Sequence, residues 1–379
     1  MKVLQICAAY KPAFVYGGPT MSVSMLSEQL AKAGVSIKVF ATTANGKTEL
    51  PVVPGQTVDV DGVAVTYFRR ITKDHTHLSP TLLNTLWKEA PGFDIIHIHA
   101  WWNLVSLFSC LIALIRKVPV VISPRGTLSS YSFQNKNIGK KWFIHSLFGR
   151  YLLNRSHIHV TSKREYEAVR HLIHPKSISI TPNFVKLPGQ REYPEPKPSD
   201  VFKLLFFSRI EEKKGLDLLL NALPMVSVPF RLTIAGDGDE NYIGYLKTIA
   251  VNNHIDNKIN WVGFYNENKF DLLHDHDLFV LPSYDENFGN VVIESLSVGT
   301  AVLISEQVGL AGYVAENNFG WICHTEPASI SDAINKIAKE NKPELMRIRQ
   351  NAPGKIYQDF NEDKLVKKYI DLYKTKIKI

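Results

Sequence analysis

Two glutamates, Glu286 and Glu294, and the loop between them carry the most distinctive chemistry in this sequence. In YDENFGNVVIES, residues 284–295, seven residues separate the two carboxylates. The run LFVLPS before the loop is typical of a strand, and NVVIESLSVG after it of a helix with Asn290 as its N-cap. The unpaired N–H groups of such a helix start favour a phosphate, and Gly289 permits close backbone approach. Glu294, one turn further on, would accept hydrogen bonds from a pair of ribose hydroxyls, while Glu286 would face another part of the same ligand.

A pair of cations at a second strand–helix junction suits the same ligand. In FFSRIEEKKGLDLLL, Arg209 ends a strand and Lys214 precedes the glycine that opens a helix. Two fixed positive charges there would neutralise a diphosphate whose leaving oxygen gains charge as a bond breaks. An ordinary solvated loop can carry the same residues, so this pattern alone does not decide the chemistry.

The elements that must position these residues alternate regularly along the chain. Apolar, β-branched runs such as KVLQICAA, VSIKVFATT, DIIHIHA and VPVVISP are separated by stretches with helical spacing, such as TMSVSMLSEQLAKAG, which Gly34 closes. Strands this apolar are buried on both faces. The rhythm therefore predicts an α/β protein built on parallel sheets with helices on either side.

A change of composition divides the chain into two halves of this kind. Residues 186–200, KLPGQREYPEPKPSD, hold four prolines and almost no apolar periodicity, which is typical of a linker. We therefore predict Rossmann-like, doubly wound domains over residues 1–185 and 201–355, with a final helix over 356–379 that packs back across them. Ligands of such sheets bind beyond the carboxyl ends of the strands, so the site is expected in a central cleft between the two domains.

Basic residues are concentrated in the first half. Asp and Glu are absent from Ile95 to Arg164, a span of 70 residues that carries ten Lys and Arg, whereas the net charge of the whole chain is +8. This basic span is either a solvated face or a surface for an anionic partner, such as acidic lipid or a phosphorylated substrate. No nucleic-acid-binding pattern accompanies the charge, so we expect no nucleic acid partner.

Cysteine usage and hydropathy indicate a cytoplasmic protein. Cys7, Cys110 and Cys323 are isolated and odd in number, which argues against a disulfide framework and fits a reducing compartment. The opening MKVLQICAAY is better explained as a buried strand than as a leader. The longest apolar run, residues 100–115, is too short to cross a bilayer. Peripheral contact with the inner face of the cytoplasmic membrane remains open because of the basic span.

Several patterns that resemble metal or dinucleotide sites have simpler explanations. Three His-x-His pairs, at 75/77, 97/99 and 157/159, lack an acidic or cysteine ligand nearby, and three Asp-x-Asp pairs, at 59/61, 237/239 and 275/277, suit turns and caps. Gly236-x-Gly238 lacks a third glycine before a helix, which disfavours a dehydrogenase. Trp101 and Trp102 are more typical of a core than of an acceptor groove. We expect no metal.

Taken together, the motifs resemble those of the retaining family 4 glycosyltransferases, which have the two-domain GT-B fold, and the resemblance covers nearly the whole chain. It rests on the two glutamates, Arg209 with Lys214, AGDGDE at 235–240, SPRGTLS at 123–129, VTSKREYEAVR at 160–170 and the pair Gly17-Gly18. The resemblance implies transfer of a hexose-type sugar from a nucleotide-diphosphate sugar, with retention at the anomeric carbon. It implies no metal and no cofactor beyond that co-substrate.

The resemblance also implies roles for residues of the second half. Arg209 and Lys214 would neutralise the diphosphate, and Glu294 would hold the ribose. Glu286 and the backbone of Asn287, Phe288, Gly289 and Asn290 would hold the transferred sugar and the β-phosphate. Base recognition is often by backbone in this family, here near Gly263-Phe264.

In the first half, the resemblance assigns Gly17-Gly18 to a loop that closes on the phosphates and the acceptor. His99, in HIHAWW, matches a position beside the anomeric centre, and Arg125, in SPRGTLS, is a candidate for binding the acceptor or a phosphate. Relatives usually lack a carboxylate nucleophile there. We therefore expect attack on the face from which the leaving group departs, with the β-phosphate accepting the acceptor's proton.

Two positions depart from the family pattern: Phe184 in TPNFV stands where the family commonly has glycine, and Asp239 in AGDGDE where proline is frequent. The predicted activity is transfer to a glycan or lipid-linked acceptor in the biosynthesis of a surface polysaccharide. Two alternatives remain open at this point. One is a catalytically silent GT-B scaffold, and the other is a soluble sugar synthase or phosphorylase.

Overall fold

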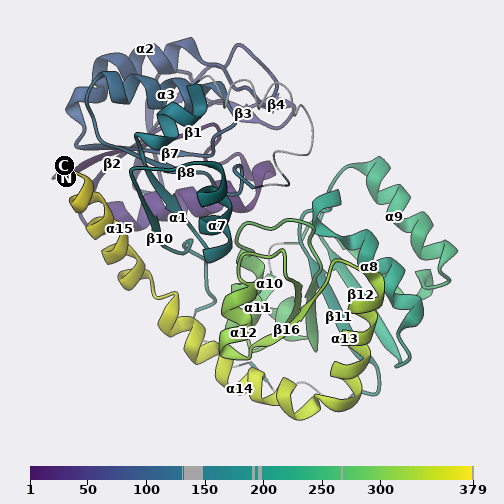
Figure 1. The fold of residues 1–379 in the computed structure, drawn as a ribbon. Coiled ribbons are helices and arrows are strands. Elements are labelled where there is room, and N and C mark those ends of the chain that lie inside the picture. The colour runs from purple at the N-terminus through teal and green to yellow at the C-terminus, as the bar shows by residue number, and fades with distance from the viewer. Residues whose placement is uncertain (130, 132–147, 190–192, 195–198, 266–267, 378–379) are drawn as a thin grey trace. The chain divides into compact units, whose positions relative to one another are not determined.

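The chain folds into two compact units. The computed structural model (Figure 1) describes residues 1–379 except 130, 132–147, 190–192, 195–198, 266–267 and 378–379. Unit 1 comprises Met1–Phe184 together with Glu362–Ile379, and unit 2 comprises Val185–Asn361. The C-terminal segment therefore returns to the first unit after the chain has completed the second.

Unit 1 is built on an eight-stranded sheet of order β10-β9-β8-β7-β1-β2-β6-β5. Neighbouring strands are parallel except for the β5–β6 hairpin. The turn of that hairpin has positive φ at Asp61 (52°) and Gly62 (81°), which confirms the predicted turn. The strands are β1 Lys2–Cys7, β2 Ser36–Thr42, β5 Thr57–Val60, β6 Val63–Phe68, β7 Ile95–His99, β8 Val120–Ser123, β9 His157–Val160 and β10 Ser177–Ile180, and a separate small ribbon pairs β3 Ala44–Asn45 with β4 Thr48–Glu49.

Helices cover both faces of this sheet. Along β1, Val3 and Cys7 belong to one hydrophobic cluster with residues of α1 and α15, whereas Leu4 and Ile6 belong to another with residues of α2 and α3. The strand is apolar at Val3, Leu4, Ile6 and Cys7 because these side chains enter one of two cores. The described helices of unit 1 are α1 Gly18–Lys32, α2 Pro80–Glu89, α3 Leu104–Ile115, α6 Arg150–Asn154, α7 Lys163–Leu172 and α15 Glu362–Ile377.

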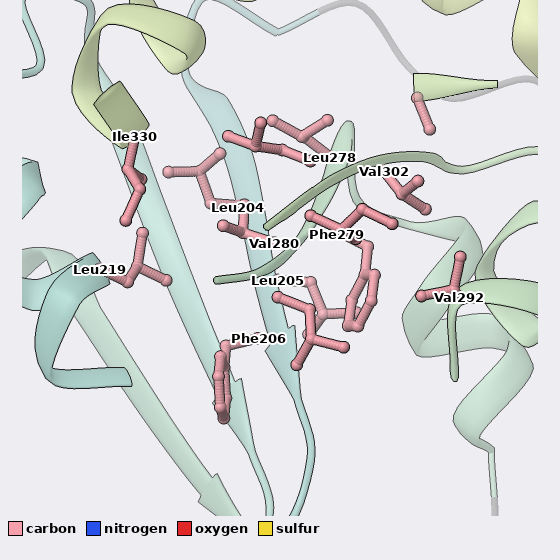
Figure 2. Close-up of a cluster of buried hydrophobic side chains, with 14 of the residues drawn as sticks. Leu204, Leu205, Phe206, Leu219, Leu278, Phe279, Val280, Val292, Val302 and Ile330 are labelled. Carbon is pink, nitrogen blue, oxygen red and sulfur yellow. The ribbon is translucent and has the colours of Figure 1, made fainter. Parts of the chain in front are cut away.

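Unit 2 contains a six-stranded, fully parallel sheet of order β13-β12-β11-β14-β15-β16. Its central strands supply Leu204, Phe206 and Phe279, which are fully buried among leucine and valine side chains of the flanking helices (Figure 2). The strands are β11 Phe202–Phe207, β12 Phe230–Ala235, β13 Ile259–Gly263, β14 Leu278–Leu281, β15 Ala301–Ser305 and β16 Gly320–Cys323. The helices are α8 Leu216–Ala222, α9 Glu240–Asn252, α10 Lys269–His274, α11 Asn290–Ser297, α12 Ala311–Asn317, α13 Pro327–Glu340 and α14 Lys342–Asp359.

The predicted linker and final helix differ from what the structure contains. The described residues of 186–200 belong to unit 2: Tyr193 stacks on His274 with ring centroids 4.7 Å apart, and the Pro194 carbonyl bonds to His274 Nε2 at 2.8 Å. Residues 190–192 and 195–198 of that segment lie outside the described residues. The helix predicted over 356–379 is two helices, because the chain breaks at buried Phe360, which packs edge-on against Phe288.

Helix α15 is an integral part of unit 1. Its apolar face, with Leu365, Tyr369 and Tyr373, is buried in the core next to β1 and α1. Phe184, which replaces the family's glycine, stacks on Tyr369 with ring centroids 5.6 Å apart. The departure from the family pattern therefore fills space against the C-terminal helix.

Within the described ranges, no helix is long and apolar enough to cross a membrane. The most apolar candidate in the sequence forms α3, which has 12 residues. It begins after Asn103, whose side chain accepts a hydrogen bond from the Ser106 N–H at 2.8 Å.

Candidate functional site

The functional residues predicted in unit 2 lie at the carboxyl ends of adjacent strands, β11 and β14. Arg209, Lys214 and Glu286 follow these two strands in the chain, and the structure brings two of them into contact. Lys214 Nζ donates a hydrogen bond to Glu286 Oε2, with only 10% and 18% of the two side chains exposed. The sequence assigned these residues to different parts of a ligand; the structure joins them in one ion pair.

Charge around Glu286 keeps its carboxylate ionised. Burial by itself would raise the pKa of Glu286, but Lys214, Lys213 and Arg209 outweigh burial and hold the pKa below its ordinary value of 4.5. Arg209 is more open, with 37% of its side chain exposed, and it pairs with Glu211 at 2.7 Å. Lys213 also pairs with Glu211, at 3.6 Å, so three cations face the two carboxylates of Glu286 and Glu211. One positive charge remains in excess, which favours an anionic ligand.

Close backbone approach at two glycines sets the position of the cationic loops. A Cβ at Gly236 would lie 1.9 Å from the Ser208 carbonyl oxygen, just before Arg209. A Cβ at Gly215 would lie 2.1 Å from the Pro282 carbonyl oxygen, just after Lys214. Each overlap is with backbone that cannot rotate away, so only glycine lets these loops lie against the neighbouring strand ends. Gly236, in AGDGDE, thus lets its loop lie against the residue that precedes Arg209.

The helix that follows Glu286 begins one residue earlier than predicted. The N-cap of α11 is Gly289, which has φ 91° and no side chain to cap, and Asn290 is the first helical residue. Phe288 is 3% exposed and belongs to the core of unit 2, so its side chain anchors the loop and leaves only its backbone for a ligand. The carbonyl of Glu286 accepts from Gly309 N at 2.8 Å, which ties the loop to the residues after β15.

Glu294, predicted to hold the ribose, is paired with a residue that the sequence reasoning missed. Lys269 Nζ lies 2.6 Å from Glu294 Oε1, with 19% and 10% of the two side chains exposed. Lys269 begins α10, a different helix, and no local motif in the sequence connects it to Glu294. The pair fixes the orientation of the Glu294 carboxylate through its Oε1 atom.

The residues predicted in unit 1 form a second group. Gly17 and Gly18 lie at the start of α1, with Gly17 at the N-cap position and φ 62°. His99 ends β7 and is 2% exposed; its Nε2 bonds to Gln5 Oε1 at 2.6 Å and its Nδ1 accepts from Arg125 Nε at 3.2 Å. Arg125 Nη1 also donates to Asn183 Oδ1 at 3.0 Å. No motif in the sequence links His99 to Arg125, and the structure makes them direct partners.

Glu165 is a further supporting residue that was not singled out. It lies in the first turn of α7 and is 6% exposed. Its Oε1 accepts from the Gly126 N–H at 2.8 Å, and its Oε2 accepts from the Thr161 N–H at 2.8 Å. The first glutamate of VTSKREYEAVR therefore holds the SPRGTLS loop that carries Arg125. The motifs SPRGTLS and VTSKREYEAVR, which are separate in the sequence, are therefore joined by a hydrogen bond in the structure.

The histidine and aspartate pairs have the partners expected of structural residues. Burial lowers the pKa of His159 to about 3 and holds the pKa values of His97 and His99 well below the ordinary 6.5. Asp239 caps α9, and Asp277 accepts from the Lys203 N–H at 2.8 Å. In the part of the chain that the structure describes, no three His, Cys, Asp or Glu side chains are grouped to hold a metal ion. Trp101 is 1% exposed in the core of unit 1.

Comparison with known proteins agrees with this geometry. Residues 16–187 match the model described as Glycosyltransferase Family 4, and residues 191–355 match Glycosyl transferases group 1. An uncharacterized glycosyltransferase of Methanocaldococcus jannaschii is 24% identical over 99% of this chain and 98% of its own. An uncharacterized 41.2 kDa protein in the cps region of Klebsiella pneumoniae is also 24% identical, over 94% of this chain and 100% of its own.

The solved structure of HepE from Anabaena, in complex with UDP-glucose, superimposes with a TM-score of 0.75 at 18% identity, over 99% of this chain and 100% of that one. This likeness confirms the predicted GT-B fold of two parallel α/β sheets. With family models matching both units in order, the chain belongs to the family 4, group 1 glycosyltransferases, which use a nucleotide sugar as donor.

Proposed function

We propose that this glycosyltransferase transfers a hexose-type sugar, with retention and without a metal, from a nucleotide-diphosphate sugar to a glycan or lipid-linked acceptor. The observation that carries the proposal is the contact between Lys214 and Glu286 at the ends of β11 and β14, beside the start of α11. A cation, a carboxylate and the N-terminus of a helix meet there. These are the groups that a sugar diphosphate requires on its phosphates and on its sugar hydroxyls.

Different residues of unit 2 would bind different parts of the donor. Arg209 and Lys214 neutralise the diphosphate, and Glu286 with the backbone of 287–290 binds the sugar and the β-phosphate. Glu294, held by Lys269, accepts from the ribose hydroxyls. The base lies near Gly263-Phe264, where the Phe264 side chain is 74% exposed and offers a stacking surface.

Transfer would then follow a path that needs no protein nucleophile. The acceptor hydroxyl attacks the anomeric carbon on the face from which the diphosphate departs. The new carbon–oxygen bond forms as the bond to the diphosphate oxygen breaks, and the acceptor's proton passes to a β-phosphate oxygen. Arg209 and Lys214 stabilise the charge that develops on the leaving group. His99 contributes by orienting Arg125, because both of its ring nitrogens are engaged within unit 1.

A role in surface polysaccharide synthesis is supported by the relative in the Klebsiella cps region. The basic span supports contact with the inner face of an anionic membrane, although residues 132–147 of it lie outside the described residues. Among those described, Phe148 and Tyr151 are 60% and 54% exposed, and Arg155 lies 4.1 Å from the Tyr151 ring. Exposed aromatic rings beside cations suit the interface of an acidic bilayer.

A thermal-shift panel tests the donor proposal. UDP, GDP and ADP, each alone and as their common hexose conjugates, are added to the wild-type protein without metal and with EDTA. One nucleotide series should raise Tm by mass action, and Glu294→Ala should abolish the shift while Lys336→Ala, on an exposed part of α13, should retain it. No shift with any nucleotide would favour a silent scaffold. Phosphate-dependent release of a free sugar would favour a phosphorylase.

Vesicle flotation tests the membrane proposal separately. Binding to vesicles of acidic phospholipid should be strong at low salt, weaken at high salt, and be absent for neutral vesicles. Equal binding to both kinds of vesicle would contradict it. Arg155→Ser with Tyr151→Ser should reduce binding without changing the nucleotide-induced Tm shift.

A further inference from the structure

A continuous line of hydrogen bonds crosses the buried interior of unit 1. It runs from Arg125 to the Thr181 carbonyl through side chains that the donor chemistry does not use. The seven bonds join Arg125 Nε to His99 Nδ1 (3.2 Å), His99 Nε2 to Gln5 Oε1 (2.6 Å), Gln5 Nε2 to Tyr373 Oη (3.2 Å), Tyr373 Oη to His97 Nδ1 (2.8 Å), His97 Nε2 to Ser123 Oγ (2.6 Å), Ser123 Oγ to His159 Nδ1 (2.6 Å) and His159 Nε2 to Thr181 O (2.9 Å).

The two ends of this line determine the position of every proton in it. Thr181 O can only accept, so His159 Nε2 carries a proton and His159 Nδ1 accepts one from Ser123. Ser123 then accepts from His97 Nε2, and His97 Nδ1 accepts from the Tyr373 hydroxyl. At the other end, the guanidinium of Arg125 can only donate, so His99 Nδ1 accepts and His99 Nε2 donates to Gln5.

The proton positions derived from the Thr181 end and those derived from the Arg125 end meet at Tyr373. Its hydroxyl donates to His97 and accepts from the Gln5 amide, so the two halves of the line agree only through this one side chain. Tyr373 comes from α15, near the end of the chain, and its side chain is fully buried. A buried phenol with both hydrogen-bonding functions satisfied fixes the orientation of its neighbours more firmly than packing alone.

We propose that Tyr373 is a positioning residue for the transfer reaction. It holds the Gln5 amide in the orientation that keeps His99 as the Nε2–H tautomer, so that the Nδ1 lone pair faces Arg125 Nε. The opposite tautomer would place an N–H against the guanidinium N–H and would release Arg125. The final helix therefore sets the direction of a cation more than 240 positions earlier in the sequence.

The importance of Arg125 for turnover rests on the proposed function, but the tautomer does not. His-selective ¹⁵N labelling reads the tautomer directly. In the wild type, His97, His99 and His159 should each show a protonated Nε2 and an unprotonated Nδ1, unchanged between pH 6 and pH 8. Single His→Gln variants assign the signals.

Tyr373→Phe removes the hydroxyl and keeps the ring, and Tyr369→Phe is its matched control. Tyr369 lies one turn away on the same helix and is 1% exposed. Its ring packs against His159, with centroids 5.1 Å apart, but its hydroxyl donates to the Pro182 carbonyl at 3.3 Å and takes no part in the seven bonds. Tyr373→Phe should shift the His99 and His97 signals and lower kcat for donor hydrolysis roughly tenfold, with KM for the nucleotide sugar unchanged. Tyr369→Phe should leave the His99 signals and kcat as in the wild type.

Two outcomes would overturn the proposal. One is a wild-type His99 that carries its proton on Nδ1, a result that needs no variant to fold. The other is a folded Tyr373→Phe protein with wild-type His99 signals and wild-type kcat. If no nucleotide sugar is turned over by the wild type, the donor proposal fails, and the tautomer measurement still decides the role of Tyr373.

Discussion

The Lys214 ammonium and the Glu286 carboxylate are in direct contact, 72 positions apart in the sequence. One follows β11 and the other follows β14, which lie next to each other in the sheet of unit 2. In the proposed function, the diphosphate of the donor would therefore share Lys214 with a carboxylate that is already present. The pairing keeps the ammonium at the ends of the strands, and it makes the two residues energetically dependent on each other.

The first prediction concerns this dependence. Lys214→Met leaves the largely buried Glu286 carboxylate without its nearest cation, and it should lower the free energy of unfolding by about 3 kcal/mol. Adding Glu286→Gln to that variant should restore much of the loss, because no unpaired charge then remains. Urea unfolding of the four proteins of the double-mutant cycle measures the coupling.

The pair Arg347–Glu344, with 37% and 38% of its side chains exposed, is the control, and its coupling should be below about 1 kcal/mol. The pH dependence gives an independent check. Since the pKa of Glu286 is lowered in the folded protein, its stabilisation is present above the ordinary value of 4.5 and is lost only as the pH falls through the lower, folded value. A coupling that disappears already at pH 6 would contradict the assignment.

The second prediction concerns Lys269. Lys269→Met removes the cation that orients Glu294 while leaving the carboxylate itself in place. Nucleotide affinity, measured by calorimetry, should fall about tenfold, because one charge-assisted hydrogen bond that supports the proposed ribose site is lost. Lys336→Met on α13 removes an exposed lysine of the same unit and should leave the affinity unchanged. Equal affinities in all three proteins would show that Glu294 needs no support.

The third prediction concerns the loop that carries Arg209. Gly236→Ala places a Cβ 1.9 Å from the Ser208 carbonyl at a backbone φ of 151°, so the loop must move. We expect stability to fall by about 1–3 kcal/mol and nucleotide binding to be lost. Gly244→Ala, in the interior of α9 with nothing within 4 Å of the new Cβ, should instead raise stability by up to ~1 kcal/mol. If the two alanine variants had the same stability and the same nucleotide affinity, the close backbone contact at Gly236 would not be needed to position Arg209.

The fourth prediction follows from the buried histidines of unit 1. Burial lowers the pKa of His157 and of His159 to about 3 and that of His77 to about 4, while His97 and His99 are held well below 6.5. Between these values and the unfolded pKa near 6.5, the unfolded chain binds more protons than the folded one. Stability is therefore fully present above pH 6.5 and is lost as the pH falls, by about 1.4 kcal/mol per pH unit for each histidine.

In unit 2, burial lowers the pKa of His276. The five histidines of unit 1 with lowered pKa values make its stability depend more steeply on pH. Unit 1 should accordingly lose protection first on acidification from pH 6.5 to pH 5. Hydrogen exchange read by mass spectrometry separates peptides of the two units in a single sample. Equal loss in both units, or earlier loss in unit 2, would show that the unit 1 histidines are not kept neutral by the fold.

The local sequence pattern was sufficient to predict the strands and helices, and to predict which charged residues follow the strands. KVLQICAA is apolar at nearly every position because β1 is buried on both faces, and this is readable from the letters alone. Arg209, Lys214 and Glu286 could be predicted as site residues because they follow such strands, at the end of the sheet where ligands bind, and Glu294 because it lies in the next helix. The helix start was misplaced by one residue at Asn290, because glycine in the left-handed region can end the loop in place of a side-chain cap.

Partnerships across the fold could not be read in the same way. Lys269 with Glu294, Glu165 with the Gly126 loop, and Tyr373 with His97 join residues from different elements, with no spacing rule between them. The sequence by itself determined two α/β halves and the charges at their strand ends, because burial and turn formation act on neighbouring residues. Only the tertiary structure decided which charge meets which, because a hydrogen bond depends on strand order and side-chain direction, and these are set by the packing of the whole unit.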